Sequence, residues 1–394
     1  MARVCLLRAF FVPDDVRVRR EINALADAGH QVTVICMRPP GSARREWYGS
    51  VEIHRLPMTH RRGGILRYAF EYVAFPLLAM LYLTLLDLRR RFELVQVNTI
   101  PDWLVFAAIG PRRRGVPIVL DLHELMPEFF ACKFGTTLRH PGVRALAMLE
   151  QASIRFADRA VTCTDEMRDA FVSRGADPDR IDVVMNSSEE AIFDPETFPP
   201  RRGRRGDRFS LICHGTIEER YGLDTIIRAL RLLDDRIPGL SLEIYGEGSY
   251  VRELRGMVAQ FGLTDRVSFN GFVPNEELVA AIADADAGVV AMKRDAFRDL
   301  THCNKMFDLI TMRRPVICSR TTSVMASFPD DCFQYFEADD DADLARAIEE
   351  VFEQPHLGHR LVERAEEQNQ AYRWLRQRER YLSLVDRALA GRQR

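Results

Sequence analysis

The sequence predicts an α/β fold with two domains, each built on a parallel sheet covered by helices. The 394 residues are enough for two domains of about 100–200 residues each. Short apolar segments alternate with amphipathic segments along both halves, which is typical of repeated strand–helix–strand units. A stretch rich in Pro, Gly and Arg separates the halves, as linkers do. We therefore expect an N-terminal domain over 1–193, a linker over 194–208, a C-terminal domain over 209–370, and a helix over 371–394 that packs back toward the N-terminal domain.

Composition narrows the classes of protein to consider. A hydrophobic content of 47% is that of a globular protein, and a net charge of −2 offers no general attraction to nucleic acid. Positive charge is concentrated locally in arginine clusters at residues 61–62, 89–91, 112–114 and 201–205. Each cluster is either a solvated face or, beside an apolar helix, a contact for an anionic membrane surface.

The eight cysteines are scattered and form no C-x-x-C pair, so a zinc site is not expected. Most of them lie in or beside expected strands, which suits buried free thiols in a reducing compartment. Residues 1–8 are expected to form a strand and not a signal peptide, because the apolar run is short and Arg8 follows at once. We therefore expect a cytoplasmic protein.

The N-terminal half begins with a strand–helix–strand unit. The expected strands cover 3–7 and 31–36, and the helix between them covers 14–28, with Asp14 or Asp15 as its N-cap. No G-x-G-x-x-G follows the first strand, so a dinucleotide fingerprint is absent there. The same alternation predicts further strands at 93–97, 117–122, 159–163, 181–185, 209–213, 240–245, 267–269, 287–291 and 315–318, and further helices at 103–113, 143–157, 165–174, 223–233, 249–260, 276–283, 304–312, 339–352 and 363–390.

The segment 65–88 is an unusually apolar helix. Its uncharged core, 72–86, has about 15 residues, short of the roughly 18 that a spanning helix needs. The pattern favours a buried crossover helix between two strands. The alternative is a helix that leans into the membrane interface, with the arginines at 89–91 among lipid headgroups.

Ionisable residues follow the strand at 117–122, which is apolar enough to lie at the centre of its sheet. Asp121, His123, Glu124 and Glu128 lie in or just after it, and ligands of open α/β sheets gather at the carboxyl ends of strands. An isolated histidine is more often a structural hydrogen-bonding group, but here its ionisable neighbours favour acid–base chemistry. His123, Asp121 and Glu124 are therefore the catalytic candidates.

Two loops of the C-terminal half precede helices and offer free backbone N–H groups to a phosphate. The first contains Gly215 and Gly222, with Arg220 between them. The second leads into a helix near Asn304, where Lys305 adds a full positive charge and Asp308 can accept hydrogen bonds from hydroxyl groups. An ordinary amphipathic helix with surface charges would explain Lys305 and Asp308 equally well from spacing alone.

Taken in order, these motifs resemble the GT-B glycosyltransferases, and more narrowly family 4, the retaining group 1 transferases of bacterial polysaccharide assembly. The resemblance covers nearly the whole chain and is carried by residues 17–21, 25–34, 120–128, 214–222, 245–248, 269–274, 304–308 and 314–317. It implies a GT-B fold, in which two Rossmann-like parallel-sheet domains face each other across a cleft and a C-terminal helix crosses back.

The resemblance also implies roles for individual residues. The donor nucleotide sugar would contact Gly215, Thr216, Arg220, Glu247, Val273, Asn304, Lys305 and Asp308. Within that set, the glycine loop, Arg220 and Lys305 would meet the diphosphate, the turn at 271–273 the base, and Asp308 the ribose. His123 would face the transferred sugar, and Asp14, Arg17 and Glu128 would lie on the acceptor side.

The chain departs from the family pattern at several donor-site positions. The first acid of the family signature falls on Leu300, beside Asp299, and the second acid is Asp308 where glutamate is usual. Thr216 stands where the family usually has an arginine, and Tyr221 stands where it usually has a lysine. Arg220 is expected to take the place of that lysine.

The resulting prediction is a retaining glycosyltransferase that uses a nucleotide-diphospho-sugar and needs neither metal nor cofactor. The expected acceptor is a glycan or a polyprenyl-diphosphate-linked sugar at the inner membrane face, in exopolysaccharide, capsule or O-antigen assembly. Two alternatives remain open: a GT-B nucleotide-sugar 2-epimerase, which has no separate acceptor, and a donor-binding scaffold relative whose active site has decayed.

Overall fold

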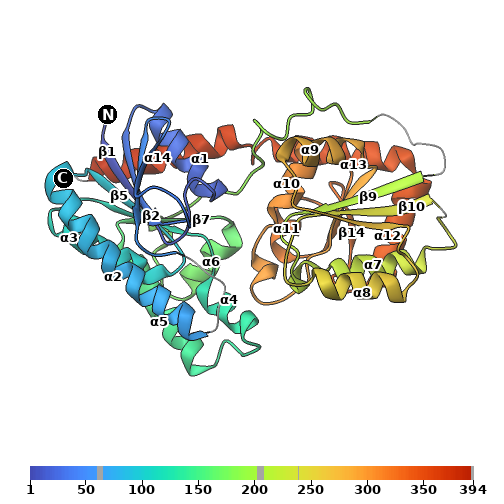
Figure 1. Cartoon of the computed structure of the whole chain (residues 1–394), viewed down its shortest axis with the longest axis horizontal. Helices are drawn as coiled ribbons and strands as arrows, with labels where there is room; N and C mark the ends of the chain where they lie inside the picture. Colours follow the sequence, from blue (N-terminus) through green and yellow to red (C-terminus); the bar gives the residue numbers. More distant parts are fainter. Residues whose placement is uncertain (60–64, 202–207, 238, 392–394) are drawn as a thin grey trace. The chain divides into compact units, whose positions relative to one another are not determined.

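The computed structural model describes residues 1–59, 65–201, 208–237 and 239–391 (Figure 1). The chain forms two compact units, of which unit 1 comprises Met1–Met185 with Gln377–Arg394 and unit 2 comprises Asn186–Arg376. The arginine clusters expected at 61–62 and 202–205 lie outside the described residues.

Unit 1 is an eight-stranded sheet in the order β3-β4-β2-β1-β5-β6-β7-β8, parallel except for the antiparallel pair β3 and β4. Its strands are β1 (Arg3–Arg8), β2 (Gln31–Met37), β3 (Arg45–Tyr48), β4 (Val51–Leu56), β5 (Leu94–Asn98), β6 (Ile118–Leu122), β7 (Arg159–Thr162) and β8 (Ile181–Val183). Its helices are α1 (Val16–Asp27), α2 (Ile65–Arg90), η1 (Asp102–Ala108), α3 (Ile109–Arg113), α4 (Met126–Lys133), α5 (Pro141–Phe156), α6 (Asp165–Ser173), η2 (Pro178–Arg180) and α14 (Trp374–Gly391), the last beginning in unit 2.

Unit 2 is a six-stranded parallel sheet in the order β11-β10-β9-β12-β13-β14. Its strands are β9 (Arg208–His214), β10 (Gly239–Tyr245), β11 (Val267–Gly271), β12 (Ala287–Val290), β13 (Val316–Ser319) and β14 (Gln334–Phe336). Its helices are η3 (Glu219–Tyr221), α7 (Leu223–Leu232), α8 (Val251–Gln260), α9 (Asn275–Asp284), η4 (Arg298–Leu300), α10 (Asn304–Thr311), α11 (Thr322–Ser327), α12 (Asp341–Glu353) and α13 (Pro355–Asn369).

Two local expectations are corrected, and the β3–β4 hairpin was not predicted at all. The helix expected at 103–113 is a 3-10 turn followed by α3, and Pro111 in it has no N–H for an α-helical ladder. The helix expected at 363–390 is broken into α13 and α14.

Unit 2 begins at Asn186, eight residues before the predicted linker. The reason is that this segment already makes contacts within unit 2. The Ser188 hydroxyl donates to the Asp308 carboxylate at 2.7 Å, and the rings of Phe193 and His214 lie 6.4 Å apart. Arg201, inside the predicted linker, pairs with Asp286 at 2.6 Å. A composition typical of a linker therefore did not mark where the contacts change.

Helix α2 is buried on one face only, so the prediction of a buried crossover helix was half right. Phe75, Ala79 and Leu83 have no exposed surface, whereas other apolar side chains of α2 are more than half exposed. Within the described residues, one helical stretch, Phe70–Arg90, is long enough and apolar enough to cross a membrane by length and composition alone. Of its most apolar 18-residue window, 39% is buried.

The C-terminal helix α14 is tied into the core of unit 1 by two buried polar contacts. The Tyr381 hydroxyl donates to Gln96 Oε1 on β5 at 2.7 Å, and Gln377 Oε1 accepts a hydrogen bond from the Met185 N–H at 2.8 Å. Both side chains are fully buried, so neither contact can be replaced by water without moving the helix.

Replacing Tyr381 with Phe should lower the free energy of unfolding by about 1–3 kcal/mol, because Gln96 Oε1 would be left buried without a donor. Tyr48→Phe is the matched control, since the Tyr48 hydroxyl has no hydrogen bond within the described residues and the residue is only partly buried. Chemical denaturation of both variants measures the difference. Equal losses would show that the contact between α14 and β5 adds nothing to stability.

Candidate functional site

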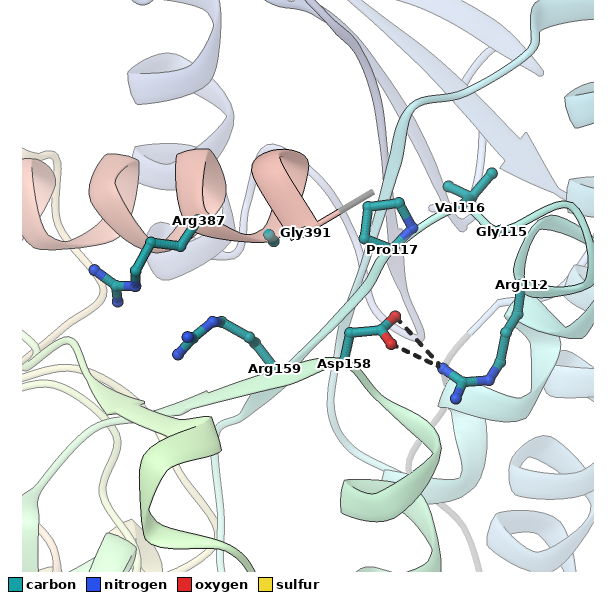
Figure 2. A pocket seen from close by; sticks show the side chains of 9 residues that line it. Arg112, Gly115, Val116, Pro117, Asp158, Arg159, Arg387 and Gly391 are labelled. Atoms are coloured by element: carbon teal, nitrogen blue, oxygen red, sulfur yellow. Dashed lines mark hydrogen bonds and ion pairs between the residues drawn. The ribbon is translucent and has the colours of Figure 1, made fainter. Parts of the chain in front are cut away.

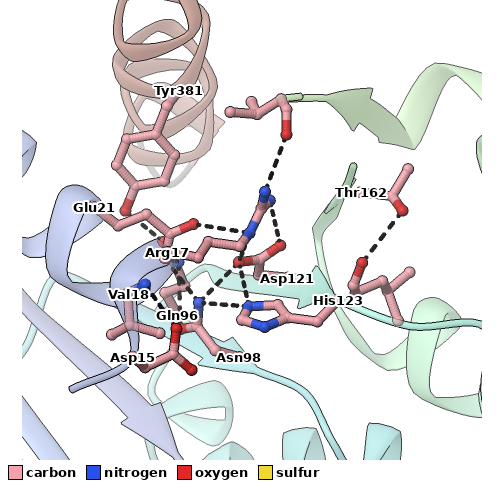
Figure 3. A network of polar contacts seen from close by, with 12 residues as sticks. Asp15, Arg17, Val18, Glu21, Gln96, Asn98, Asp121, His123, Thr162 and Tyr381 are labelled. Carbon is pink, nitrogen blue, oxygen red and sulfur yellow. Dashed lines mark hydrogen bonds and ion pairs between the residues drawn. The ribbon is translucent and has the colours of Figure 1, made fainter. Parts of the chain in front are cut away.

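The carboxyl ends of β1, β5 and β6 lie side by side in unit 1, because the parallel register pairs Arg8 with Asn98 and Asn98 with Asp121. Arg17, on α1 above this edge, holds Asp121 with two hydrogen bonds of 2.8 and 2.9 Å (Figure 3). A third arginine nitrogen donates to the Val184 carbonyl. Buried charges of this kind are tolerated because they are paired, and removing one partner typically costs about 3–5 kcal/mol.

Asp121 in turn positions His123. The His123 Nε2 lies 2.9 Å from Asp121 Oδ2, and the His123 backbone N–H donates to the Thr99 hydroxyl at 3.0 Å. Burial lowers the pKa of His123, and the charge of Asp121 opposes that shift only in part. The ring is therefore neutral near pH 7, with Nε2–H donating to the carboxylate and Nδ1 left as the acceptor. The side chain is 11% exposed, so small hydroxyl groups can reach it.

A second carboxyl group, Glu21, lies in the same network. Its Oε2 accepts hydrogen bonds from the side-chain amides of Gln96 at 2.8 Å and Asn98 at 2.7 Å. Asn98 also donates to Asp121 at 2.8 Å. Burial and the neighbouring charge of Asp121 raise the pKa of Glu21 well above its ordinary value, whereas Asp121, despite burial, is held well below its own by Arg17. The site thus balances one cation with one anion and keeps the second carboxyl group neutral.

The structure places the other predicted residues of unit 1, which are Asp14, Glu124 and Glu128, in different surroundings. Asp14 is exposed, and its neighbour Asp15 is the N-cap of α1, pairing with Arg8 at 2.8 Å. Glu128 is buried and pairs with Arg174 at 2.6 Å. Glu124 is partly buried, and its charge contributes to a raised pKa at the buried Asp102. Of the carboxylates expected around His123, the structure brings Asp121 into contact with it.

In unit 2, three loops at the carboxyl ends of adjacent strands are joined through their backbones. Gly215 N–H donates to the Tyr245 carbonyl, Ile217 N–H to the Glu247 carbonyl, and Gly246 N–H to the Gly271 carbonyl. Gly246 has a φ of +127°, and a Cβ there would lie 1.9 Å from the Gly215 oxygen. Only glycine permits this approach. The predicted Gly215, Glu247 and Val273 loops therefore belong to one edge of the sheet.

Lys305 lies over this edge from the first turn of α10. Its Nζ is 3.4 Å from the Thr216 carbonyl oxygen and 4.1 Å from the centre of the Tyr221 ring. A Cβ on Gly215 would approach Lys305 Cε to 2.8 Å, so the absence of a side chain at this position leaves room for the lysine side chain. The Arg220 guanidinium lies 5.2 Å from the same ring. Neither Lys305 nor Arg220 has an ion pair among the residues that the structure describes, so both charges are available to an anion.

Asp308 lies one turn further along α10 from Lys305. Its Oδ1 accepts a hydrogen bond from the Ser188 hydroxyl at 2.7 Å, and its Oδ2 is 4.0 Å from His214 Nε2. Burial and the charge of Lys305 lower the pKa of His214 to about 3, so this histidine is neutral. Asn304, the first residue of the helix, is exposed. A carboxylate and a cation are thus gathered in the first turns of one helix, where the helix dipole also favours an anion.

The structure also shows the surroundings of Leu300, the position of the first signature acid, and of its neighbour Asp299. Leu300 ends the short turn η4. Its neighbour Asp299 accepts hydrogen bonds from the Thr322 N–H at 2.9 Å and the Thr322 hydroxyl at 2.7 Å, and pairs with Arg294. Asp299 therefore stabilises the start of α11 through both of its carboxylate oxygens.

A separate cavity of about 430 Å³ lies at the opposite, amino-terminal edge of the unit 1 sheet. Pro117 and Arg159, which precede or begin β6 and β7, line it together with Arg112, whose guanidinium pairs with Asp158 at 3.4 Å (Figure 2). None of the predicted site residues lines it. Over the described part of the chain, no group of three or more His, Cys, Asp or Glu side chains could hold a metal ion.

Sequence reasoning missed several members of both sites. In unit 1 these are Glu21, Gln96, Asn98 and Tyr381, and in unit 2 they are Ser188 and His214. One signal was present: Gln96 and Asn98 are polar residues in a strand that is otherwise apolar. Ser188 and Tyr381 gave none, because their partners are more than 100 residues away in the chain.

Comparison with known families covers most of the chain. Residues 15–187 match the family described as Glycosyl transferase 4-like domain, and residues 194–368 match the family described as Glycosyl transferases group 1.

Individual proteins agree with these matches. The chain is 27% identical to 2-deoxystreptamine glucosyltransferase of Streptomyces kanamyceticus over 69% of this chain and 73% of that protein. It is 37% identical to GDP-mannose-dependent alpha-(1-6)-phosphatidylinositol monomannoside mannosyltransferase of Mycobacterium tuberculosis, over only 22% of each chain. Sucrose-phosphate synthase from Thermosynechococcus elongatus has the same fold, with a TM-score of 0.78 at 17% identity over 99% of this chain and 100% of that one.

Replacing Glu21 with Gln should make the free energy of unfolding of the variant increasingly larger than that of the wild type as pH rises from about 5 to about 8. The unfolded chain loses the Glu21 proton near the ordinary pKa of about 4.3, whereas the folded chain retains it because its pKa is raised, so the wild type is progressively destabilised above that pH. Glutamine mimics the neutral acid and removes this penalty. Denaturation at several pH values measures it, with Glu276→Gln at the exposed start of α9 as the control. A difference that does not change with pH would contradict a neutral Glu21.

Proposed function

Because the chain belongs to the group 1 glycosyltransferases, whose two parallel-sheet units form the GT-B fold, we propose that it transfers a sugar from a nucleotide-diphospho-sugar to an acceptor hydroxyl with retention of configuration. The observation that carries the donor half of the proposal is Lys305. It is a cation without an ion pair in the described residues, placed over a glycine loop at the start of a helix.

In the proposed donor site, the diphosphate binds to Lys305, Arg220 and the backbone N–H groups at the start of α10. These groups stabilise the negative charge that the diphosphate gains as it leaves, and they are oriented before the reaction begins. Asp308 accepts hydrogen bonds from ribose hydroxyl groups. Ser188 acts through Asp308, because its 2.7 Å hydrogen bond fixes one carboxylate oxygen and so the orientation of the group.

In the proposed reaction, the bond between the sugar C1 and the diphosphate oxygen breaks, and its electron pair leaves with the diphosphate. The acceptor oxygen forms a new bond to C1 on the same face, and its proton passes to the departing diphosphate. His123 orients the transferred sugar by accepting a hydrogen bond at Nδ1, while Asp121 holds its other nitrogen at 2.9 Å. Arg17 acts through Asp121. Two cations supply the charge stabilisation, so the proposal requires no metal.

The proposed acceptor is a glycan or a lipid-linked sugar presented at the inner face of the cell membrane, in polysaccharide assembly. Two observations support a lipid-linked acceptor over a free sugar. Helix α2 exposes an apolar face, and one relative carries phosphatidylinositol monomannoside in its name. Asp14 and Glu128 are kept as acceptor-side residues in this proposal, although Glu128 would act only by holding Arg174.

Replacing Lys305 with Ala should weaken binding of a nucleoside diphosphate by about tenfold, the loss of one charge-assisted contact of about 1.4 kcal/mol. The measurement is a thermal-shift titration with UDP, GDP, ADP, dTDP and CMP, followed by calorimetry with whichever diphosphate raises the melting temperature of the wild type. Lys133→Ala, on α4 of unit 1, is the matched control. A folded wild type that responds to none of these nucleotides would contradict the donor site and favour a decayed scaffold.

Replacing His123 with Ala should lower kcat by about 100-fold while leaving diphosphate binding unchanged, because the histidine orients the transferred sugar and does not contact the diphosphate. In the wild type, kcat/KM should stay level as pH falls to about 6.5 and decline only below it, since the folded pKa of His123 lies below its ordinary value. His356→Ala, at an exposed position on α13, serves as the control. A decline that begins above pH 6.5 would assign the limb to another group.

A further inference from the structure

Helix α2 carries a straight row of large apolar side chains on its solvent face. The row consists of Phe70, Val73, Leu77, Leu81, Leu85 and Leu88, each between 54% and 67% exposed. Their spacing of three and four residues keeps them on one side of the helix, over a length of about 27 Å. We call this row the α2 stripe. The surfaces of soluble proteins rarely expose a contiguous apolar patch of this length unless it binds a partner.

The opposite face of α2 is packed against unit 1, and this packing limits how the helix can contact a lipid bilayer. Phe75, Ala79 and Leu83 are fully buried, and Asp87 near the helix end forms two hydrogen bonds of 2.6 and 2.7 Å with Arg114. Gly110 of α3 approaches so closely that a Cβ there would overlap Thr84. A helix held in this way cannot leave the core to cross a bilayer. It can only lie along a surface.

Cations and a tryptophan surround the C-terminal end of the stripe. Arg89 and Arg91 are exposed and have no ion pair within the described residues. On the edge strand β3, Trp47 lies opposite Glu52, whose carboxylate pairs with Arg90 of α2 at 3.0 Å. Directly opposed residues share one face of a sheet, so Trp47, 66% exposed, lies on the face that α2 covers. Arginine and tryptophan beside an apolar surface are the side chains that favour the headgroup region of a bilayer.

We propose that the α2 stripe is a docking surface for an anionic lipid bilayer, with the helix lying in the plane of the membrane and Arg89, Arg91 and Trp47 at the headgroups. The free arginines match the negative potential of the cytoplasmic leaflet. This inference rests on the proposed function only for the choice of that leaflet, and it identifies the surface by which the enzyme would reach a lipid-linked acceptor.

The test is co-sedimentation of the full chain with vesicles of phosphatidylcholine alone and of phosphatidylcholine and phosphatidylglycerol in equal parts. The wild type should bind the anionic vesicles and bind them less well at high salt. The double variant Leu77→Gln with Leu81→Gln should partition at least about tenfold less, because glutamine keeps the helix and removes the apolar surface. Leu232→Gln, an exposed leucine on α7 of unit 2, should bind like the wild type.

Three results would overturn the inference. The wild type could remain in the supernatant with both vesicles, or the double variant could bind as well as the wild type. Alternatively, the wild type could sediment as a dimer without lipid while the double variant is a monomer, which would assign the stripe to a second copy of the chain. Nucleoside diphosphate binding, measured without vesicles on the same proteins, separates failure of this surface from failure of the proposed function.

Discussion

One buried ion pair, between Arg17 and Asp121, determines the shape of the site in unit 1. Arg17 uses two nitrogens on the carboxylate and a third on a backbone carbonyl, so the arginine has little freedom. Its charge keeps Asp121 ionised against the cost of burial, and Asp121 then fixes one nitrogen of His123. Burial and the charge of Asp121 keep Glu21 neutral, although its Oε1 lies 3.6 Å from Arg17 Nε. The pair therefore fixes the charge of Asp121, while burial keeps His123 and Glu21 neutral.

Unit 2 uses its cations in the opposite way. Arg17 is neutralised within the fold and therefore positions other groups. Lys305 and Arg220 face a shared aromatic ring and a carbonyl, with no carboxylate paired to them in the described residues. A cation left in this state attracts an anion from solution, and the glycine loop beside it leaves room for one. The two units thus differ in whether the fold supplies the counter-charge of the cation.

Helix α2 shows how the same residues serve folding and surface chemistry. Phe75, Ala79, Leu83 and Leu86 are buried against unit 1, whereas the six large apolar side chains of the α2 stripe are more than half exposed. Neither a core helix nor a spanning helix explains that division. The buried face anchors the helix, and the exposed face is left for an interaction outside the chain.

The sequence by itself determined the α/β class, the alternation of strands and helices, and the loops after β6, β9 and β10, because apolar periodicity and glycine placement are local properties. It also predicted Lys305, Asp308, His123 and Asp121 as candidate site residues, since each lies within a few residues of a strand end or helix start. Only the tertiary structure decided that Glu21 and Tyr381 both form hydrogen bonds with Gln96. It also decided that Glu128 pairs with Arg174 and that Ser188 donates a hydrogen bond to Asp308. Those contacts depend on sheet order and register, which bring distant segments together and leave no mark in the local pattern.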